Sequence, residues 1–148
     1  MVERTEREVL NMLIETCRDG AMGFKTAADH VDNRELRAMF LTLAEERDRF
    51  AAELVPHAQR LGGAAASDGT NIGALHRKWI DLKSALVGQD DRAVVVEASR
   101  GDRATVHVYQ DAIEGLLPPE ARDIIERQFG VFQDEHEKLA NAANHVKA

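Results

Sequence analysis

Four polar side chains stand where the helical spacing of the sequence predicts an apolar core: Arg47, Asp102, Gln128 and Glu135. A charge buried alone costs several kcal/mol, so a buried charge should have a partner of opposite sign. A guanidinium can bind a carboxylate through two parallel hydrogen bonds. These residue types therefore predict a buried polar network in which Arg47 pairs with Asp102 or Glu135. The alternative is that the Arg47 stem packs against the core and its charged end reaches solvent.

Other side chains offer weaker chemistry. His136 neighbours Glu135 and could complete a metal site with Asp102, or it could be a partly buried, hydrogen-bonded structural residue. Cys17, the single cysteine, lies on an apolar stripe, which favours a buried and inert thiol over a redox group. No arrangement of Ser, His and Asp or of Cys and His indicates a catalytic residue. Trp79 is either a core anchor or, if its helix packs loosely, an anchor for a protein partner.

Helical elements must position these side chains, because apolar residues recur at spacings of 3 and 4 through most of the chain. The clearest stripe is Leu36, Phe40, Leu43, Arg47, Phe50 and Leu54. Asn33 is a good N-cap, Gly62 and Gly63 suit a helix end, and Pro118 and Pro119 suit a helix start. The sequence predicts helices over about 5–31, 34–61, 72–87, 91–115 and 119–146.

A weak internal repeat relates the two halves of the chain. Phe24 and Tyr109 are 109 − 24 = 85 positions apart, and the same offset pairs Leu54 with Leu139. The short joints make each pair of helices an antiparallel hairpin. We therefore expect one all-α domain over 1–148, an antiparallel four-helix bundle with hairpins at 5–61 and 91–146. A crossover at 62–90 carries the extra short helix.

The composition limits the partners. With 19 Lys and Arg against 26 Asp and Glu, the net charge is −7, which disfavours nucleic acid and anionic membranes. The apolar runs are far shorter than the roughly 20 residues that span a bilayer. The segment MVERTEREV lacks the apolar core of a signal peptide, and one cysteine allows no intrachain disulfide, so we expect a cytoplasmic protein.

Three segments carry a resemblance to a known family: GALHRKWIDLKSALVGQDD at 73–91, LIETCRDG near the start and LPPEARDIIERQ near the end. They resemble an uncharacterised bacterial four-helix-bundle family, a domain of unknown function in the ferritin-like superfamily. The resemblance covers most of the chain and implies a ferritin-like topology, but no activity. The chain departs from the family at 97–102, EASRGD, where the family tends to carry more acidic residues.

A ferritin-like fold raises the question of a di-iron site, which uses a Glu from each of two helices and Glu-x-x-His from each of the other two. When the halves are aligned on Phe24 and Tyr109, the ligand positions fall on six residues: Cys17, Asp102, Arg47, Phe50, Phe132 and Glu135. Only two of these are acidic, Arg47 would repel a cation, and the sequence contains no Glu-x-x-His. We therefore predict no cofactor, and di-iron or another divalent metal is the alternative.

Two functions remain open from the sequence. The first is a non-enzymatic helical protein that associates with itself, as a homodimer, or with a protein partner. The second is a ferritin-like metal-binding or oxidoreductase protein with a remodelled site around Asp102, Glu135 and His136. Metal analysis of the purified protein separates the two.

Overall fold

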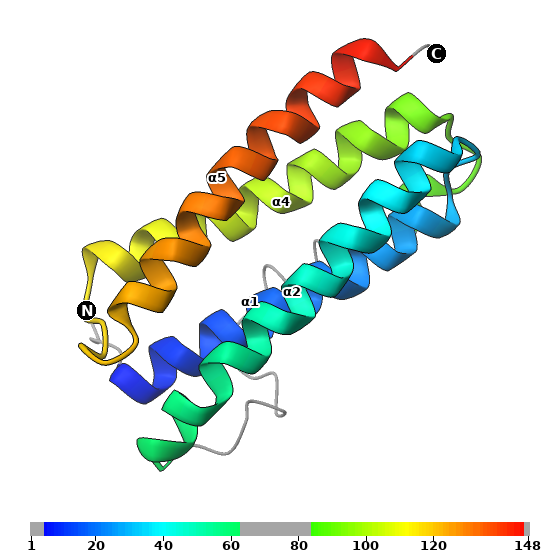
Figure 1. Cartoon of the computed structure of the whole chain (residues 1–148). Helices are drawn as coiled ribbons and strands as arrows, with labels where there is room; N and C mark the ends of the chain where they lie inside the picture. The colour runs from blue at the N-terminus through cyan, green and yellow to red at the C-terminus, as the bar shows by residue number, and fades with distance from the viewer. Residues whose placement is uncertain (1–4, 63–83, 147–148) are drawn as a thin grey trace.

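The described part of the chain, residues 5–62 and 84–146 of a computed structural model, is all-helical (Figure 1). Its four long helices are α1 (Glu6–Asp29), α2 (Arg34–Arg60), α4 (Asp91–Glu114) and α5 (Arg122–His145). Residues 84–86 are also helical. In these ranges no helix is long and apolar enough to cross a membrane. The predicted all-α class is confirmed.

Side-chain caps fix the starts of three helices. The Thr5 hydroxyl accepts a hydrogen bond from the Glu8 amide in α1, and Asn33 caps α2 in the same way, as predicted. Asp90 caps α4 by accepting from the Ala93 amide. Each cap satisfies an amide that has no partner within its helix. At the other end of α2, Gly62 has a φ of 83°, a left-handed conformation that suits glycine.

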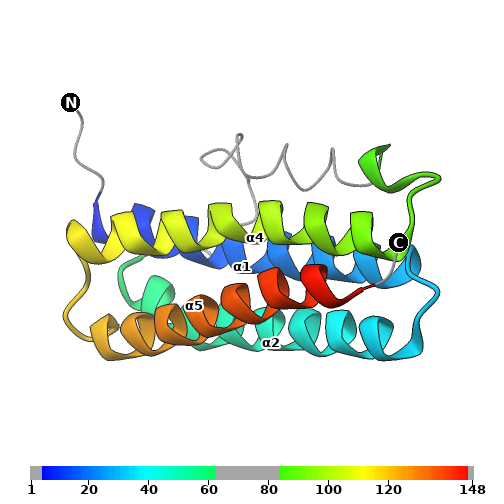
Figure 2. The same cartoon turned by 90° about the horizontal axis from the view of Figure 1, so that it is seen from above.

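The helices pack side by side in two layers, with α1 and α4 in one and α2 and α5 in the other (Figure 2). The most extensive contacts join α1 to α2 and α4 to α5, and α1 also packs on α4, whereas α2 and α5 touch least among the neighbouring pairs. The Asp91 carboxylate accepts hydrogen bonds of 2.9 Å from the amides of Asp32 and Asn33. This contact ties the start of α4 to the joint between α1 and α2.

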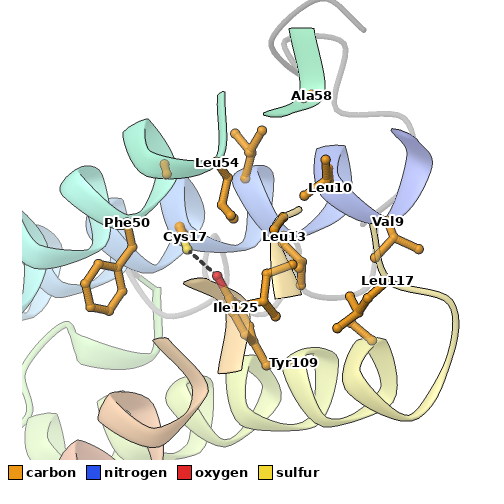
Figure 3. Packing of buried hydrophobic residues seen from close by; sticks show 14 of the residues in the cluster. Val9, Leu10, Leu13, Cys17, Phe50, Leu54, Ala58, Tyr109, Leu117 and Ile125 are labelled. Atoms are coloured by element: carbon orange, nitrogen blue, oxygen red, sulfur yellow. Dashed lines mark hydrogen bonds between the residues drawn. The ribbon is translucent and has the colours of Figure 1, made fainter. Parts of the chain in front are cut away.

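The apolar core has two clusters. One contains Phe24, Phe40, Leu43, Val95 and Leu139, among others. The other gathers Leu10, Leu13, Leu54, Tyr109 and Ile125 with their neighbours (Figure 3). Arg47 and Asp102, both fully buried, belong to neither cluster.

One predicted helix boundary needs correction. The last helix begins at Arg122 instead of 119, because residues 119–121 form a turn in which the Ala121 amide donates to the Pro118 carbonyl. Near the helix ends, Leu116 and Leu61 are exposed, whereas Leu117 and Ala58 are buried. The predicted helix over 72–87 lies mostly outside the described residues, and so does Trp79.

Candidate functional site

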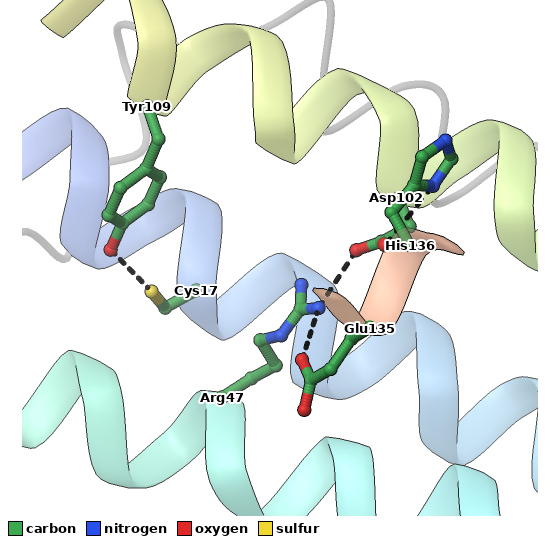
Figure 4. Close-up of polar contacts among 6 residues, drawn as sticks. All are labelled: Cys17, Arg47, Asp102, Tyr109, Glu135 and His136. Carbon is green, nitrogen blue, oxygen red and sulfur yellow. Dashed lines mark hydrogen bonds and ion pairs between the residues drawn. The ribbon is translucent and has the colours of Figure 1, made fainter. Parts of the chain in front are cut away.

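Arg47 is the largest fully buried side chain of the described residues. It projects from α2 into the space between the helices, where Asp102 of α4 and Glu135 of α5 approach it (Figure 4). Its Nη2 atom lies 2.9 Å from Asp102 Oδ1 and 3.3 Å from Glu135 Oε1. The contact with Glu135 is a hydrogen bond, and the contact with Asp102 is an ion pair by distance. The structure therefore places Arg47 beside both carboxylates that its stripe predicted as partners.

Two aromatic rings complete the surroundings of the Arg47 guanidinium. Its Cζ atom lies 4.1 Å from the ring centroid of Phe132 and 5.0 Å from that of Phe24. A desolvated cation over an aromatic ring gains about 2 kcal/mol. Gly20 of α1 faces the side chain, and a Cβ there would make an ordinary van der Waals contact of 3.4 Å with Arg47 Nη1. Two carboxyl groups and two ring faces thus surround one buried cation.

The electrostatics differ between the Arg47 and Glu135 side chains. Burial alone would lower the pKa of Arg47, but Asp102 and Glu135 outweigh burial and raise this pKa. Burial raises the pKa of Glu135 to about 8, and the nearby Glu46 carboxyl adds to the rise. At neutral pH the Glu135 carboxyl is therefore largely protonated, and Asp102 is the carboxylate that balances Arg47.

His136 approaches the far side of Asp102, with Nδ1 at 3.5 Å from Asp102 Oδ2, and it is partly exposed. The weak metal candidates Asp102, Glu135 and His136 therefore do meet in space. The Arg47 guanidinium, however, lies between the two carboxylates, at the position that a bound cation would share with them. Over residues 5–62 and 84–146, no group of three or more His, Cys, Asp or Glu side chains is arranged to hold a metal ion. The donor set does not fit a di-iron centre.

Gln128 was predicted in the Arg47 network, and the structure places it in a separate one. Its Oε1 atom accepts a hydrogen bond of 2.6 Å from Tyr109, and its Nε2 atom donates to the Phe50 carbonyl and to Glu53. The Tyr109 hydroxyl also lies 3.1 Å from the Cys17 sulfur. Gln128 is two helical turns from Glu135 on α5, which is too far along the helix for both side chains to reach Arg47.

The second network leads from the core to the surface. Burial raises the pKa of the Cys17 thiol to about 11 and that of Tyr109 well above its usual value, so both groups stay protonated at neutral pH. At the outer end, burial would raise the pKa of Glu53, but hydrogen bonds from Gln128 and Arg127 lower it. The network is thus neutral inside and ionised only at its exposed end, where Glu53 pairs with Arg127. This fits the structural role predicted for the thiol.

Sequence reasoning missed two residues beside these networks. Glu46 lies next to Arg47 in the chain but off the apolar stripe, and its contact with Glu135 depends on the spacing of α2 and α5. Thr105 is fully buried one turn after Asp102, and its hydroxyl has no hydrogen-bond partner among the described residues. The signal available in the sequence was a polar residue, Thr105, one turn after Asp102 on the buried face of α4.

The chain matches the model of a known protein family. The model of the family described as "Domain of unknown function (DUF2383)" matches residues 5–115. That span includes Arg47 and Asp102, and it ends before α5 and Glu135. No curated protein matches the chain.

Proposed function

The chain belongs to this family of unknown function, and we propose that it is a non-enzymatic helical protein that acts by self-association or by binding a protein partner. The observation that carries the proposal is the buried Arg47, which lies between Asp102 and Glu135. The ion pair with Asp102 and the hydrogen bond to Glu135 support a structural role for these side chains in the packing of α2, α4 and α5.

The fold class that goes with this proposal is a single-domain antiparallel four-helix bundle of ferritin-like topology, in a protein of bacterial origin. Three aspects of the structure support it. α1 packs on α2, α4 packs on α5, and contacts in one half recur in the other at the offset of 85 residues. Arg47 contacts Phe24, and Phe132 contacts Tyr109, where 132 − 47 = 85 and 109 − 24 = 85.

Self-association as a homodimer is the specific form that we propose, in the cytoplasm and without nucleic acid. Met22 on α1 and Leu41 on α2 are 60% and 43% exposed and offer apolar contact points. Cyclic dimers are the commonest oligomers. The net charge of −7 supports a protein partner over nucleic acid.

Light scattering tests the homodimer at micromolar concentration. A mass of twice the 16.4 kDa chain is the expected result. Met22→Ser and Leu41→Ser should lower the mass toward that of the single chain. Thr42→Ser, a change at a polar exposed position of α2, is the control. A single-chain mass for the unsubstituted protein would remove self-association and leave partner binding.

The second candidate function is a metal-binding or oxidoreductase protein with a remodelled site. The meeting of Asp102, Glu135 and His136 favours it, and the charge of Arg47 opposes it. Metal analysis of the purified protein after incubation with Fe²⁺, Mn²⁺ or Zn²⁺ discriminates. We expect no stoichiometric metal that depends on Asp102. Two bound metal ions, lost in Asp102→Asn, would overturn the non-enzymatic proposal.

A further inference from the structure

A groove of about 370 Å³ lies between α2 and α5, which make the least extensive of the helix contacts between neighbours. Its walls are one stripe from each helix: Glu35, Ala38, Met39, Thr42 and Leu43 from α2, and Glu135, Lys138 and Leu139 from α5. The volume falls in the range of about 300–1,000 Å³ that is usual for small-molecule sites. Ala38, Met39, Leu43 and Leu139 give the groove apolar walls, so an occupant needs an apolar body.

The charges along the groove are unequal. Glu35 and Glu135 line it, and Glu46 stands one turn beyond Thr42 on the same stripe and contacts Glu135. Lys138, an exposed side chain, is the one basic residue in the lining. Asp102 balances the charge of Arg47, so Glu35 and Glu46 outnumber Lys138 even while Glu135 is protonated, and this excess favours a positively charged ligand over an anionic one.

The Glu135 carboxyl connects this groove to the buried Arg47 pair. Its side chain is 15% exposed, so it reaches the groove, while its Oε1 atom accepts from Arg47. Water has little access to this carboxyl, and an ion pair formed there is less screened than one at the surface.

We propose that the groove between α2 and α5 binds a small primary alkylamine, with its alkyl chain against Met39, Leu43 and Leu139 and its ammonium on Glu135. The lining does not include Met22 or Leu41, the residues proposed for self-association. An alkyl chain matches the aliphatic walls, and the ammonium can donate to Glu135 and to the Thr42 hydroxyl.

Binding of the amine should release a proton. The charged groups that face Glu135 are Arg47 and Glu46 from α2, with Asp102 of α4 behind Arg47 and Lys138 on α5 itself. At pH 7 the Glu135 carboxyl is largely protonated, because burial and Glu46 raise its pKa to about 8. An ammonium beside it favours the carboxylate, and the displaced proton passes to the buffer.

Calorimetric titration of the full chain with hexylammonium, hexanol and hexanoate tests the site, because the three probes share one alkyl chain. We expect saturable binding of hexylammonium, at least about tenfold tighter than hexanoate, with hexanol between them. In buffers of different ionisation enthalpy, the hexylammonium signal should show proton release. Equal or tighter binding of hexanoate, or no saturable binding, would overturn the proposal.

Two pairs of variants locate the binding. Met39→Lys adds a cation inside the groove and should reduce hexylammonium affinity at least about tenfold. Ala52→Lys adds the same charge on an exposed part of α2 that does not line the groove and should leave affinity within about twofold. Glu135→Gln should remove the preference for ammonium and the proton release, while Glu137→Gln, an exposed neighbour, should keep both. Thermal melts show that each variant is folded. An unchanged affinity in Met39→Lys contradicts the site.

Discussion

The two halves of the core place different chemistry at equivalent positions. We define the charged layer as Arg47, Glu135, Asp102 and Phe24, and the aromatic layer as Phe132, Phe50, Cys17 and Tyr109. Each residue of one layer is 85 positions from a residue of the other, as in 132 − 47 = 85 and 135 − 50 = 85. The contacts correspond as well. Arg47 pairs with Glu135 where Phe132 packs on Phe50, with ring centroids 5.4 Å apart.

The comparison shows what a charge in the core requires. Phe132 needs only neighbours of suitable shape, and Phe50 and Tyr109 supply them. Arg47, at the equivalent position, needs a carboxylate, a second carboxyl and two ring faces. In the aromatic layer the polar groups of Cys17 and Tyr109 are uncharged and hydrogen-bonded. The same helical framework therefore accepts either solution, provided that no charge stays unpaired.

The largest effect should come from removing the charge of Arg47. Arg47→Ala leaves the Asp102 carboxylate buried without its partner and empties a fully buried volume. We expect the free energy of unfolding to fall by about 3–5 kcal/mol, measured by urea denaturation. Arg49→Ala, an exposed position on the same helix, should change it by less than about 0.5 kcal/mol. A loss for Arg47→Ala no larger than that of Arg49→Ala would place the guanidinium in solvent.

A smaller loss is expected from the aromatic layer. Tyr109→Phe keeps the ring and its contact with Phe132, and it removes the hydroxyl that donates to Gln128. The Gln128 oxygen is then buried without a donor, so stability should fall by about 1–3 kcal/mol. A thermal melt identical to that of the unsubstituted protein would show that the hydroxyl contributes nothing to the fold.

The charged layer should also make stability depend on pH. Because the pKa of Glu135 is about 8 in the folded protein and that of an unfolded glutamate is about 4.3, folding favours the protonated form. The contribution of Glu135 is present below about pH 4 and is lost as the pH rises toward about 8. Solvent screening reduces the loss, which we expect to be about 1–2 kcal/mol. Glu135→Gln should remove this part of the pH dependence, whereas Glu137→Gln should retain it. Parallel pH profiles for Glu135→Gln and the unsubstituted protein would contradict the shift.

The helices and the partners of Arg47 could be predicted from the sequence for one physical reason. Apolar periodicity fixes which face of a helix is buried, and a polar residue on that face must find a partner. The same reasoning placed Gln128 in the wrong network. An apolar stripe shows which side of a helix is buried, but it does not show at which level along the bundle a side chain meets its partner. It missed Glu46, whose contact with Glu135 depends on the separation of α2 and α5. The start of α5 was also placed too early, since proline permits a turn at 119–121 as readily as a first helical turn.

The most direct test of the account is a double-mutant cycle on Arg47 and Asp102, with Arg47→Met and Asp102→Leu measured singly and together by urea denaturation. Each single change leaves one buried charge without its main partner. The double change leaves none, since the remaining Glu135 carboxyl stays protonated at neutral pH. We predict a double variant more stable than either single variant, with a coupling energy of about 1–3 kcal/mol. Additive losses, with a coupling below about 0.5 kcal/mol, would contradict a buried ion pair at the centre of this protein.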